Sequence, residues 1–215
     1  MWWRMTAALL VGLAGGCGGN ELSRALADLT SQDYEQRRMG AHALFELRPD
    51  RPDVVAALIQ AGDDPDSEVR RWACRALGEL TSAEDRVVTV LEARLRDPET
   101  AVRRAAAFAL HKRSPESTAY RTELLAAVTE GDGGVIVALG TLQPRPTWAI
   151  PALVKSLQDR RPGLRRLAAE CLGQLGAWTP EVRQALDRAC QDADDRVRSA
   201  ASEALARLQL PPENG

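Results

Sequence analysis

The sequence contains few of the side chains that most often carry out catalysis or hold a metal. Its 215 residues include two histidines, His42 and His111, and four cysteines, and aromatic residues make up 4%. Neither histidine is followed by glutamate, so the paired His-Glu motifs that bind iron are absent from the sequence. The sequence also has no glycine-rich phosphate loop, no Cys-x-x-Cys pair and no recognisable Ser/His/Asp set. We therefore expect no metal, no cofactor and no enzymatic activity.

Charge of one sign is not in large excess either. The chain carries 28 basic and 30 acidic residues, a net charge of −2, and removal of residues 1–16 would take away only Arg4 and change this to −3. Proteins that bind nucleic acid in bulk neutralise many phosphates with basic side chains. We therefore expect no nucleic-acid partner.

Long apolar runs are absent except near the N-terminus. Residues 5–16 form a 12-residue apolar and small stretch, shorter than the ~20 residues that a membrane-spanning helix needs. With Arg4 before it, this stretch predicts a signal peptide at residues 1–16. It resembles a bacterial lipoprotein signal, and that resemblance implies lipidation at Cys17 after cleavage.

The lipoprotein resemblance also implies a location. We expect a protein of the bacterial cell envelope, lipid-anchored to a membrane, with residues 17–21 as the lipidated cysteine and a short tether. Ordinary secretion, or an apolar N-terminus without a targeting role, are the alternatives.

The rest of the chain repeats itself. A small residue followed by leucine recurs six times with spacings of 33, 33, 29, 33 and 33 residues. These anchor leucines are Leu44, Leu77, Leu110, Leu139, Leu172 and Leu205. Self-similarity at such a period is the signature of a repeat architecture. We place the array at residues 22–209, followed by a tail at 210–215.

Each copy has the pattern of two helices. Val69, Ala73 and Leu77 fall on one stripe of a helix with 3.6 residues per turn. A second amphipathic run, such as residues 54–59, precedes it, and Asp64-Pro65 separates the two. One helical hairpin cannot bury its apolar stripe alone, whereas stacked neighbours can. The sequence therefore predicts an all-α fold, an α-solenoid of about six two-helix repeats.

The residues of one copy identify the kind of repeat. Asp64, Val69-Arg70, Ala73 and the run Ala76-Leu77-Gly78 with Leu80 resemble the short HEAT-like repeat found in bilin-lyase-type proteins. The resemblance covers residues 22–208. It implies a structural ladder in which an arginine of one copy contacts a turn aspartate of its neighbour. The ladder residues would be Arg37, Arg70, Arg103, Arg165 and Arg198 with Asp64, Asp97, Asp159 and Asp192.

The fourth copy, near residues 120–147, is irregular. It is four residues shorter, has Asp132 in the arginine column, and gains several glycines and prolines. We expect a kink or a softer joint near residues 130–147.

Differences between copies indicate where a partner would bind. In an α-solenoid the second helices line the concave side. We expect the positions six, three and two before the anchor leucine, and one after it, to face that side. In the first three copies these positions supply a predicted partner-binding face. Its members are Arg38, His42, Phe45, Arg71, Arg75, Arg104, Phe108 and His111. Such a face would bind an acidic or extended protein segment, the alternative being a solvated surface with two incidental phenylalanines.

Three cysteines follow Cys17. Cys171 occupies a column that otherwise holds alanine, which predicts a buried small residue. A Cys171–Cys190 disulfide between neighbouring copies is the alternative in an oxidising compartment.

These observations favour a membrane-anchored HEAT-like repeat scaffold that binds a protein partner through its concave surface. The alternative is a non-catalytic subunit or chaperone-like helper of an enzyme, in the style of bilin lyases.

Overall fold

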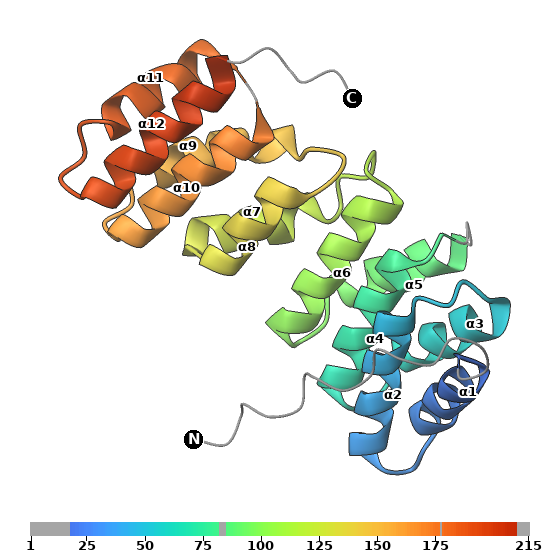
Figure 1. The fold of residues 1–215 in the computed structure, drawn as a ribbon. Helices are drawn as coiled ribbons and strands as arrows, with labels where there is room; N and C mark the ends of the chain where they lie inside the picture. Colours follow the sequence, from blue (N-terminus) through green and yellow to red (C-terminus); the bar gives the residue numbers. More distant parts are fainter. Residues whose placement is uncertain (1–17, 82–84, 177, 210–215) are drawn as a thin grey trace, which may run out of the picture. The chain divides into compact units, whose positions relative to one another are not determined.

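The structure, a computed structural model, describes residues 18–81, 85–176 and 178–209 (Figure 1). These residues form twelve α-helices and one 3-10 helix, and no strand occurs among them. The chain divides into two compact units, residues 1–90 and 91–215. The predicted signal peptide at 1–16, Cys17 and the tail at 210–215 lie outside the described residues.

The helices alternate as first and second helices of six pairs, which confirms the all-α repeat architecture. They are α1 (Gly18–Leu29), α2 (Tyr34–Leu47), α3 (Pro52–Ala61), α4 (Ser67–Glu79), α5 (Asp85–Arg94), α6 (Thr100–Arg113), α7 (Arg121–Glu130), α8 (Gly133–Thr141), the 3-10 helix η1 (Thr147–Ala149) with α9 (Ile150–Ser156), α10 (Pro162–Leu175), α11 (Pro180–Ala189) and α12 (Asp195–Gln209).

The first helix starts earlier than the sequence suggests. We expected residues 17–21 to be a tether, but α1 begins at Gly18, so this prediction is wrong for residues 18–21. Glu21 in the first turn of α1 is favourable there because a carboxylate complements the positive end of the helix dipole.

Acidic residues and prolines in the turns set the helix starts. The carboxylate of Asp66 accepts hydrogen bonds from the backbone N–H groups of Glu68 and Val69 at 3.0 and 3.1 Å, which satisfies donors that the helix cannot pair itself. Asp33 and Asp132 cap α2 and α8 in the same way. Proline occupies the start of α3, α9, α10 and α11, where its missing N–H costs nothing.

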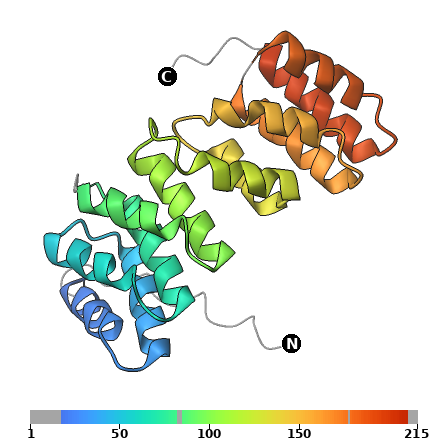
Figure 2. The same cartoon turned by 180° about the vertical axis from the view of Figure 1, so that it is seen from behind.

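In the first unit α2 packs against both α1 and α4, and α3 packs against α4 (Figures 1 and 2). The anchor leucines Leu44 and Leu77 are fully buried, as is Leu58 of α3. The backbones of α1 and α2 approach closely, since a Cβ placed on Gly40 would lie 2.4 Å from the backbone nitrogen of Leu29. A small residue is therefore required four positions before this anchor leucine.

In the second unit α10 contacts α8, α9 and α12, and α11 pairs with α12. Anchor leucines Leu110, Leu139 and Leu172 are again fully buried. A Cβ on Gly173 would lie 2.9 Å from the Cα of Ala204, so α10 and α12 also pack with little space between them. The anchor column is thus the core of the array in both units.

The irregular fourth copy keeps its helix pair. Only Gly131 and Asp132 connect α7 to α8, and Gly131 has a positive φ of 80°, a conformation that glycine adopts without strain. This short connection lies within the copy that is four residues shorter than the others. A softer joint near residues 130–147 stays a prediction.

Candidate interaction surface

Two arginine–aspartate pairs join neighbouring copies as the resemblance implies. Arg37 donates from Nε and Nη2 to the two carboxylate oxygens of Asp64, at 2.7 and 3.1 Å. Arg165 donates in the same way to Asp192, at 2.7 Å for both contacts. The Arg165 hydrogen bonds hold the pKa of Asp192 below its ordinary value. Such bidentate pairs fix geometry as well as supplying energy.

The same arginine column also closes the turn of its own copy. In each case Nη1 donates to one or two backbone carbonyl oxygens five and six residues earlier, at 2.8 to 3.1 Å. The arginines are Arg37, Arg70, Arg103, Arg165 and Arg198. Their recurrence is therefore explained by folding, because every copy has the same turn to close.

The ladder changes around the fourth copy. Arg103 donates to Glu123 at 3.1 Å, since no aspartate stands at the matching position of the next copy. Asp159 pairs with Arg161 of its own turn rather than with an arginine of the preceding copy, because that copy has Asp132 in the arginine column. The hydrogen bond from Arg161 lowers the pKa of Asp159 to about 2. The prediction of a ladder contact is thus wrong for Asp159.

Two arginines predicted to face a partner are instead occupied within the fold. Arg38 donates to both carboxylate oxygens of Asp66, at 2.8 and 2.6 Å. Arg104 forms ion pairs with Asp132 and, at 2.9 Å, with Glu130. Asp66 is the N-cap of α4 and Asp132 is the N-cap of α8. Each caps the second helix of the copy that follows, so its carboxylate is within reach of the arginine six positions before the anchor leucine of the preceding copy. These contacts give Arg38 and Arg104 a structural role in place of the predicted free cationic surface.

Five side chains of α2 and α4 form an aromatic and cationic cluster. His42 and Phe45 come from α2, and Arg71, Trp72 and Arg75 come from α4; we call them the α2–α4 patch. The Trp72 ring is at its centre, with ring centroids 4.3 Å from His42 and 5.4 Å from Phe45. The Arg75 guanidinium carbon lies 4.4 Å from the Trp72 centroid and 4.5 Å from the Phe45 centroid. His42 and Arg75 are exposed to solvent, and the other three are half-buried.

The electrostatics of the α2–α4 patch centre on Arg75. Burial of its guanidinium, and then the positive charge of Arg71, lower the pKa of Arg75 below its ordinary value. The Arg71 guanidinium also lies over Trp72, at 4.9 Å from the ring centroid, and pairs with Glu68. The guanidinium groups of Arg71 and Arg75 therefore both contact the Trp72 ring.

Trp72 was not among the residues predicted for the binding face. It stands five positions before the anchor leucine, a position that we did not assign to the exposed face. The same column holds residues of very different size in the other copies, namely Met39, Ala105, Gly134, Leu167 and Ala200. The repeat therefore does not require a tryptophan at this position.

His111 does not belong to a partner-binding face. Only 1% of it is exposed, so this prediction is wrong. Its Nε2 donates to the Pro144 carbonyl at 2.6 Å, and Nδ1 lies 3.1 Å from the Tyr120 hydroxyl. The Tyr120 hydroxyl also lies 3.0 Å from the Pro115 carbonyl oxygen, to which it donates its single proton. Burial lowers the pKa of His111 below its ordinary 6.5 and is the largest effect. The hydrogen bond to Pro144 raises this pKa, whereas the positive charges of Arg121 and Lys112 lower it further.

Two of the four predicted columns are largely buried. Three positions before the anchor leucine, five of six copies hold a fully buried residue, namely Ala41, Cys74, Ala107, Ile136 and Ala169. The position after the leucine is buried at Gly78, His111 and Gly173. At Gly173 the cause is direct, because Ala204 of the next second helix lies against it. Phe108 is half-buried and lies in the second unit, like Arg104.

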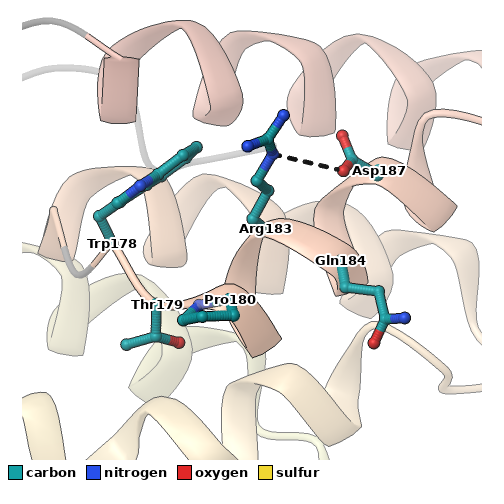
Figure 3. Close-up of a pocket in the computed structure, with 6 residues that line it drawn as sticks. All are labelled: Trp178, Thr179, Pro180, Arg183, Gln184 and Asp187. Atoms are coloured by element: carbon teal, nitrogen blue, oxygen red, sulfur yellow. Dashed lines mark ion pairs between the residues drawn. The ribbon is translucent and has the colours of Figure 1, made fainter.

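A shallow pocket lies at the start of α11, with a volume of about 370 Å³ (Figure 3). Trp178, Thr179, Pro180 and the α11 side chains Arg183, Gln184 and Asp187 line it. Arg183 lies over the Trp178 ring at 5.6 Å and pairs with Asp187 at 3.8 Å, so its charge is already matched within the pocket. No nucleophile stands beside a base among the lining residues.

The described part of the chain holds no group of three or more metal-binding side chains. None of the described helices has the length and apolar character needed to cross a bilayer. Cys74, Cys171 and Cys190 form no disulfide in the described structure, and burial raises the pKa of the Cys171 thiol to about 12.

Residues 22–111 and 129–206 match the model of HEAT repeats. The chain belongs to the HEAT-repeat family. No curated protein sequence matches it.

Solved structures share the fold at low sequence identity. The complex of CpcE and CpcF of phycocyanin lyase from Nostoc sp. PCC7120 matches with 24% identity over 96% of this chain and 81% of that chain, at a TM-score of 0.56. A designed armadillo repeat protein in complex with the peptide (KR)4 matches with 17% identity over 88% of this chain and 100% of that chain, at a TM-score of 0.58. An engineered protein matches with 23% identity over 88% of this chain and 97% of that chain, at a TM-score of 0.55. These similarities concern the fold alone.

Proposed function

We propose that this protein is a non-enzymatic scaffold that binds a protein partner through its second helices, with the α2–α4 patch as the main contact. The observation that carries the proposal is the solvent-accessible cluster of Trp72, Phe45, His42 and two arginines, in which His42 and Arg75 are exposed and the others half-buried. Tryptophan and arginine dominate the binding energy of many protein interfaces. Stacking of the repeats does not require tryptophan at this position, since Ala105 and Ala200 occupy it in two other copies.

The structural neighbours are consistent with such a role. One of them holds a peptide, and another is a complex of two named subunits. A fold of this kind therefore occurs in a protein that binds a peptide and in the two-subunit complex of a lyase, and binding to another chain is what the two have in common.

The proposal places the scaffold at a membrane of the bacterial cell envelope. The supporting features are the apolar stretch of residues 5–16 and the cysteine that follows it. Because α1 begins at Gly18, lipidation of Cys17 would hold the first copy next to the lipid surface. Mass spectrometry of the mature protein from the membrane fraction tests this: a diacylated or triacylated Cys17 is expected, and an unprocessed soluble chain would refute it.

A second candidate function is a non-catalytic helper subunit of an enzyme. The observation that favours it is the fold similarity to the CpcE–CpcF complex, which extends over 96% of this chain. The two candidates differ in what the captured partner does. A helper would raise the activity of the enzyme that it binds, whereas a scaffold would bind without changing it.

The central test is capture of the partner from detergent-solubilised envelope by the purified chain and by single variants. Trp72→Ala is expected to reduce capture strongly. Trp178→Ala is the matched control, because Trp178 is also a partly exposed tryptophan under an arginine but lies at the α11 pocket. Circular dichroism melts would check that both variants remain folded. Equal capture by Trp72→Ala and wild type would refute the role of the α2–α4 patch.

A further inference from the structure

The arginines of the predicted binding face differ in whether a carboxylate already neutralises them. Arg38 pairs with Asp66, Arg71 pairs with Glu68, and Arg104 pairs with Glu130 and Asp132. Arg75 differs: within residues 18–81, 85–176 and 178–209, no carboxylate forms an ion pair with its guanidinium.

Acidic side chains do lie near Arg75, but within the described residues none forms an ion pair with it. Glu46 and Glu79 favour the charged form of Arg75 through space. Glu46 lies 3.7 Å from His42, and Glu79 forms an ion pair with Arg48 at 3.5 Å. Arg75 therefore has aromatic contacts and the through-space attraction of two glutamates, opposed by burial and by the repulsion of Arg71.

The two aromatic rings hold the guanidinium in place. Phe45 and Trp72 are tilted by 47° to one another with centroids 5.4 Å apart, and the Arg75 guanidinium carbon lies about equally far from both centroids. A guanidinium that stacks on rings keeps its N–H groups in its own plane, where they can donate to a carboxylate in a bidentate manner. Less conformational entropy is lost on binding when the side chain is already held in position.

The surrounding charges limit what can bind. Carboxylates are as numerous as guanidinium groups around the Phe45 and Trp72 rings, although only Arg48 and Arg71 form ion pairs there, with Glu79 and Glu68, and Glu46 lies beside His42. A run of acidic residues would meet these glutamates, and so would a phosphate, which carries a charge of about −1.5 to −2. A single carboxylate with apolar neighbours meets the least repulsion and also covers the exposed parts of the rings.

We propose that Arg75 is the binding site for a single carboxylate side chain of the partner, flanked in that partner by apolar side chains that pack on Phe45 and Trp72. This deepens the proposed function and rests on it. It also narrows the expected partner from an acidic segment to an extended apolar segment with one Asp or Glu at the contact.

Defined peptides test the carboxylate site without the natural partner. The probe is a labelled, end-capped octapeptide of leucine and serine with one central glutamate, compared with the same peptide carrying glutamine or phosphoserine. Fluorescence anisotropy with the full chain is expected to show at least 10-fold tighter binding of the glutamate peptide than of the other two. The Nε–Hε signal of Arg75 in proton–nitrogen spectra should shift with the glutamate peptide and not with the glutamine peptide.

Variants connect the preference to Arg75. Arg75→Gln is expected to remove the preference for glutamate over glutamine. The matched control is Arg183→Gln, which alters a guanidinium that also lies over a tryptophan but is paired with Asp187; it should keep the preference. Equal binding of the glutamate and glutamine peptides, tighter binding of phosphoserine, or loss of the preference in Arg183→Gln would each overturn the proposal.

The outcome can be separated from that of the proposed function. If Trp72→Ala abolishes capture of the envelope partner while Arg75→Gln captures it as well as wild type, the binding surface stands and the carboxylate site is wrong. If neither variant reduces capture, the binding surface itself is wrong.

Discussion

Replacement of Gly40 by alanine tests how closely α1 and α2 pack. On helix propensity alone this substitution in a helix interior would stabilise the protein by about 1 kcal/mol. In the structure, however, the new Cβ would lie 2.4 Å from the backbone nitrogen of Leu29 and 2.7 Å from the carbonyl oxygen of Ala25. Backbone atoms cannot rotate away, so α1 must move, and overpacking of this kind costs about 1–3 kcal/mol, occasionally more. Because the clash is with backbone atoms, we take the upper end of this range, about 3 kcal/mol; subtraction of the gain of about 1 kcal/mol leaves an expected net loss of about 2 kcal/mol.

The assay is a thermal melt followed by circular dichroism, together with hydrogen exchange of the α1 amides. A loss of 2 kcal/mol corresponds to a decrease in Tm of about 4–8 °C for a chain of this size. Loss of protection should be concentrated in α1, because each copy of a repeat array contacts only its neighbours. Gly163→Ala is the matched control, since a Cβ there meets no atom within 4 Å, and it should leave Tm unchanged or raise it. A Gly40→Ala variant as stable as wild type, with unchanged α1 protection, would show that the close approach of α1 and α2 is wrong.

Three further predictions concern single side chains of the second unit. The folded state lowers the pKa of His111 and so favours its neutral form; the stability that this contributes should be present above pH 6.5 and be lost progressively below it. Plots of the free energy of unfolding against pH, from pH 5 to 8, should therefore differ in slope between wild type and His111→Gln, and parallel plots would contradict this. Arg165→Gln should lower the free energy of unfolding by about 1–2 kcal/mol in urea titrations at neutral pH. This difference should decrease as the pH falls below 3.8, the ordinary pKa of Asp192, because the ion pair is then lost, and the remainder reflects the hydrogen bond from Arg165 to the Asp159 carbonyl; a difference that does not change with pH would show that the ion pair with Asp192 contributes nothing. Cys171, whose burial raises its pKa to about 12, should react with iodoacetamide far more slowly in the native protein than the half-buried Cys190, as read by peptide mass spectrometry, and equal rates would contradict its burial.

The repeat itself was predictable because each copy encodes the same local structure. The anchor leucines mark the buried side of every second helix, and five of the six are fully buried. The contacts of Arg37 and Arg165 with Asp64 and Asp192 follow from the same regularity, since the distance in sequence between partners is 27 residues in both cases. Periodicity of apolar residues is a strong signal when it recurs, because every copy reports on the same face.

The binding face was only partly predictable. Sequence spacing placed Phe45 and Arg75 on the second helices, and the structure brings both onto Trp72. It could not show that Arg38 reaches the N-cap carboxylate of the next copy, because that contact depends on the separation of two helices. Nor could it show that His111 is covered by the Pro144 segment, which follows an irregular connection.

The sequence by itself determined the class of fold, the number of repeats and the column that forms the core, because these depend on periodicity and on local turn chemistry. Only the tertiary structure decided which described arginines of the predicted binding face form an ion pair, since that depends on how far side chains reach between copies. Arg38 and Arg75 are both arginines on neighbouring second helices, yet one meets Asp66 and the other meets two aromatic rings. The two arginines differ because helix packing brings a carboxylate to one and aromatic rings to the other. The position of a residue within its own repeat does not predict which side chains of the adjacent copy will contact it.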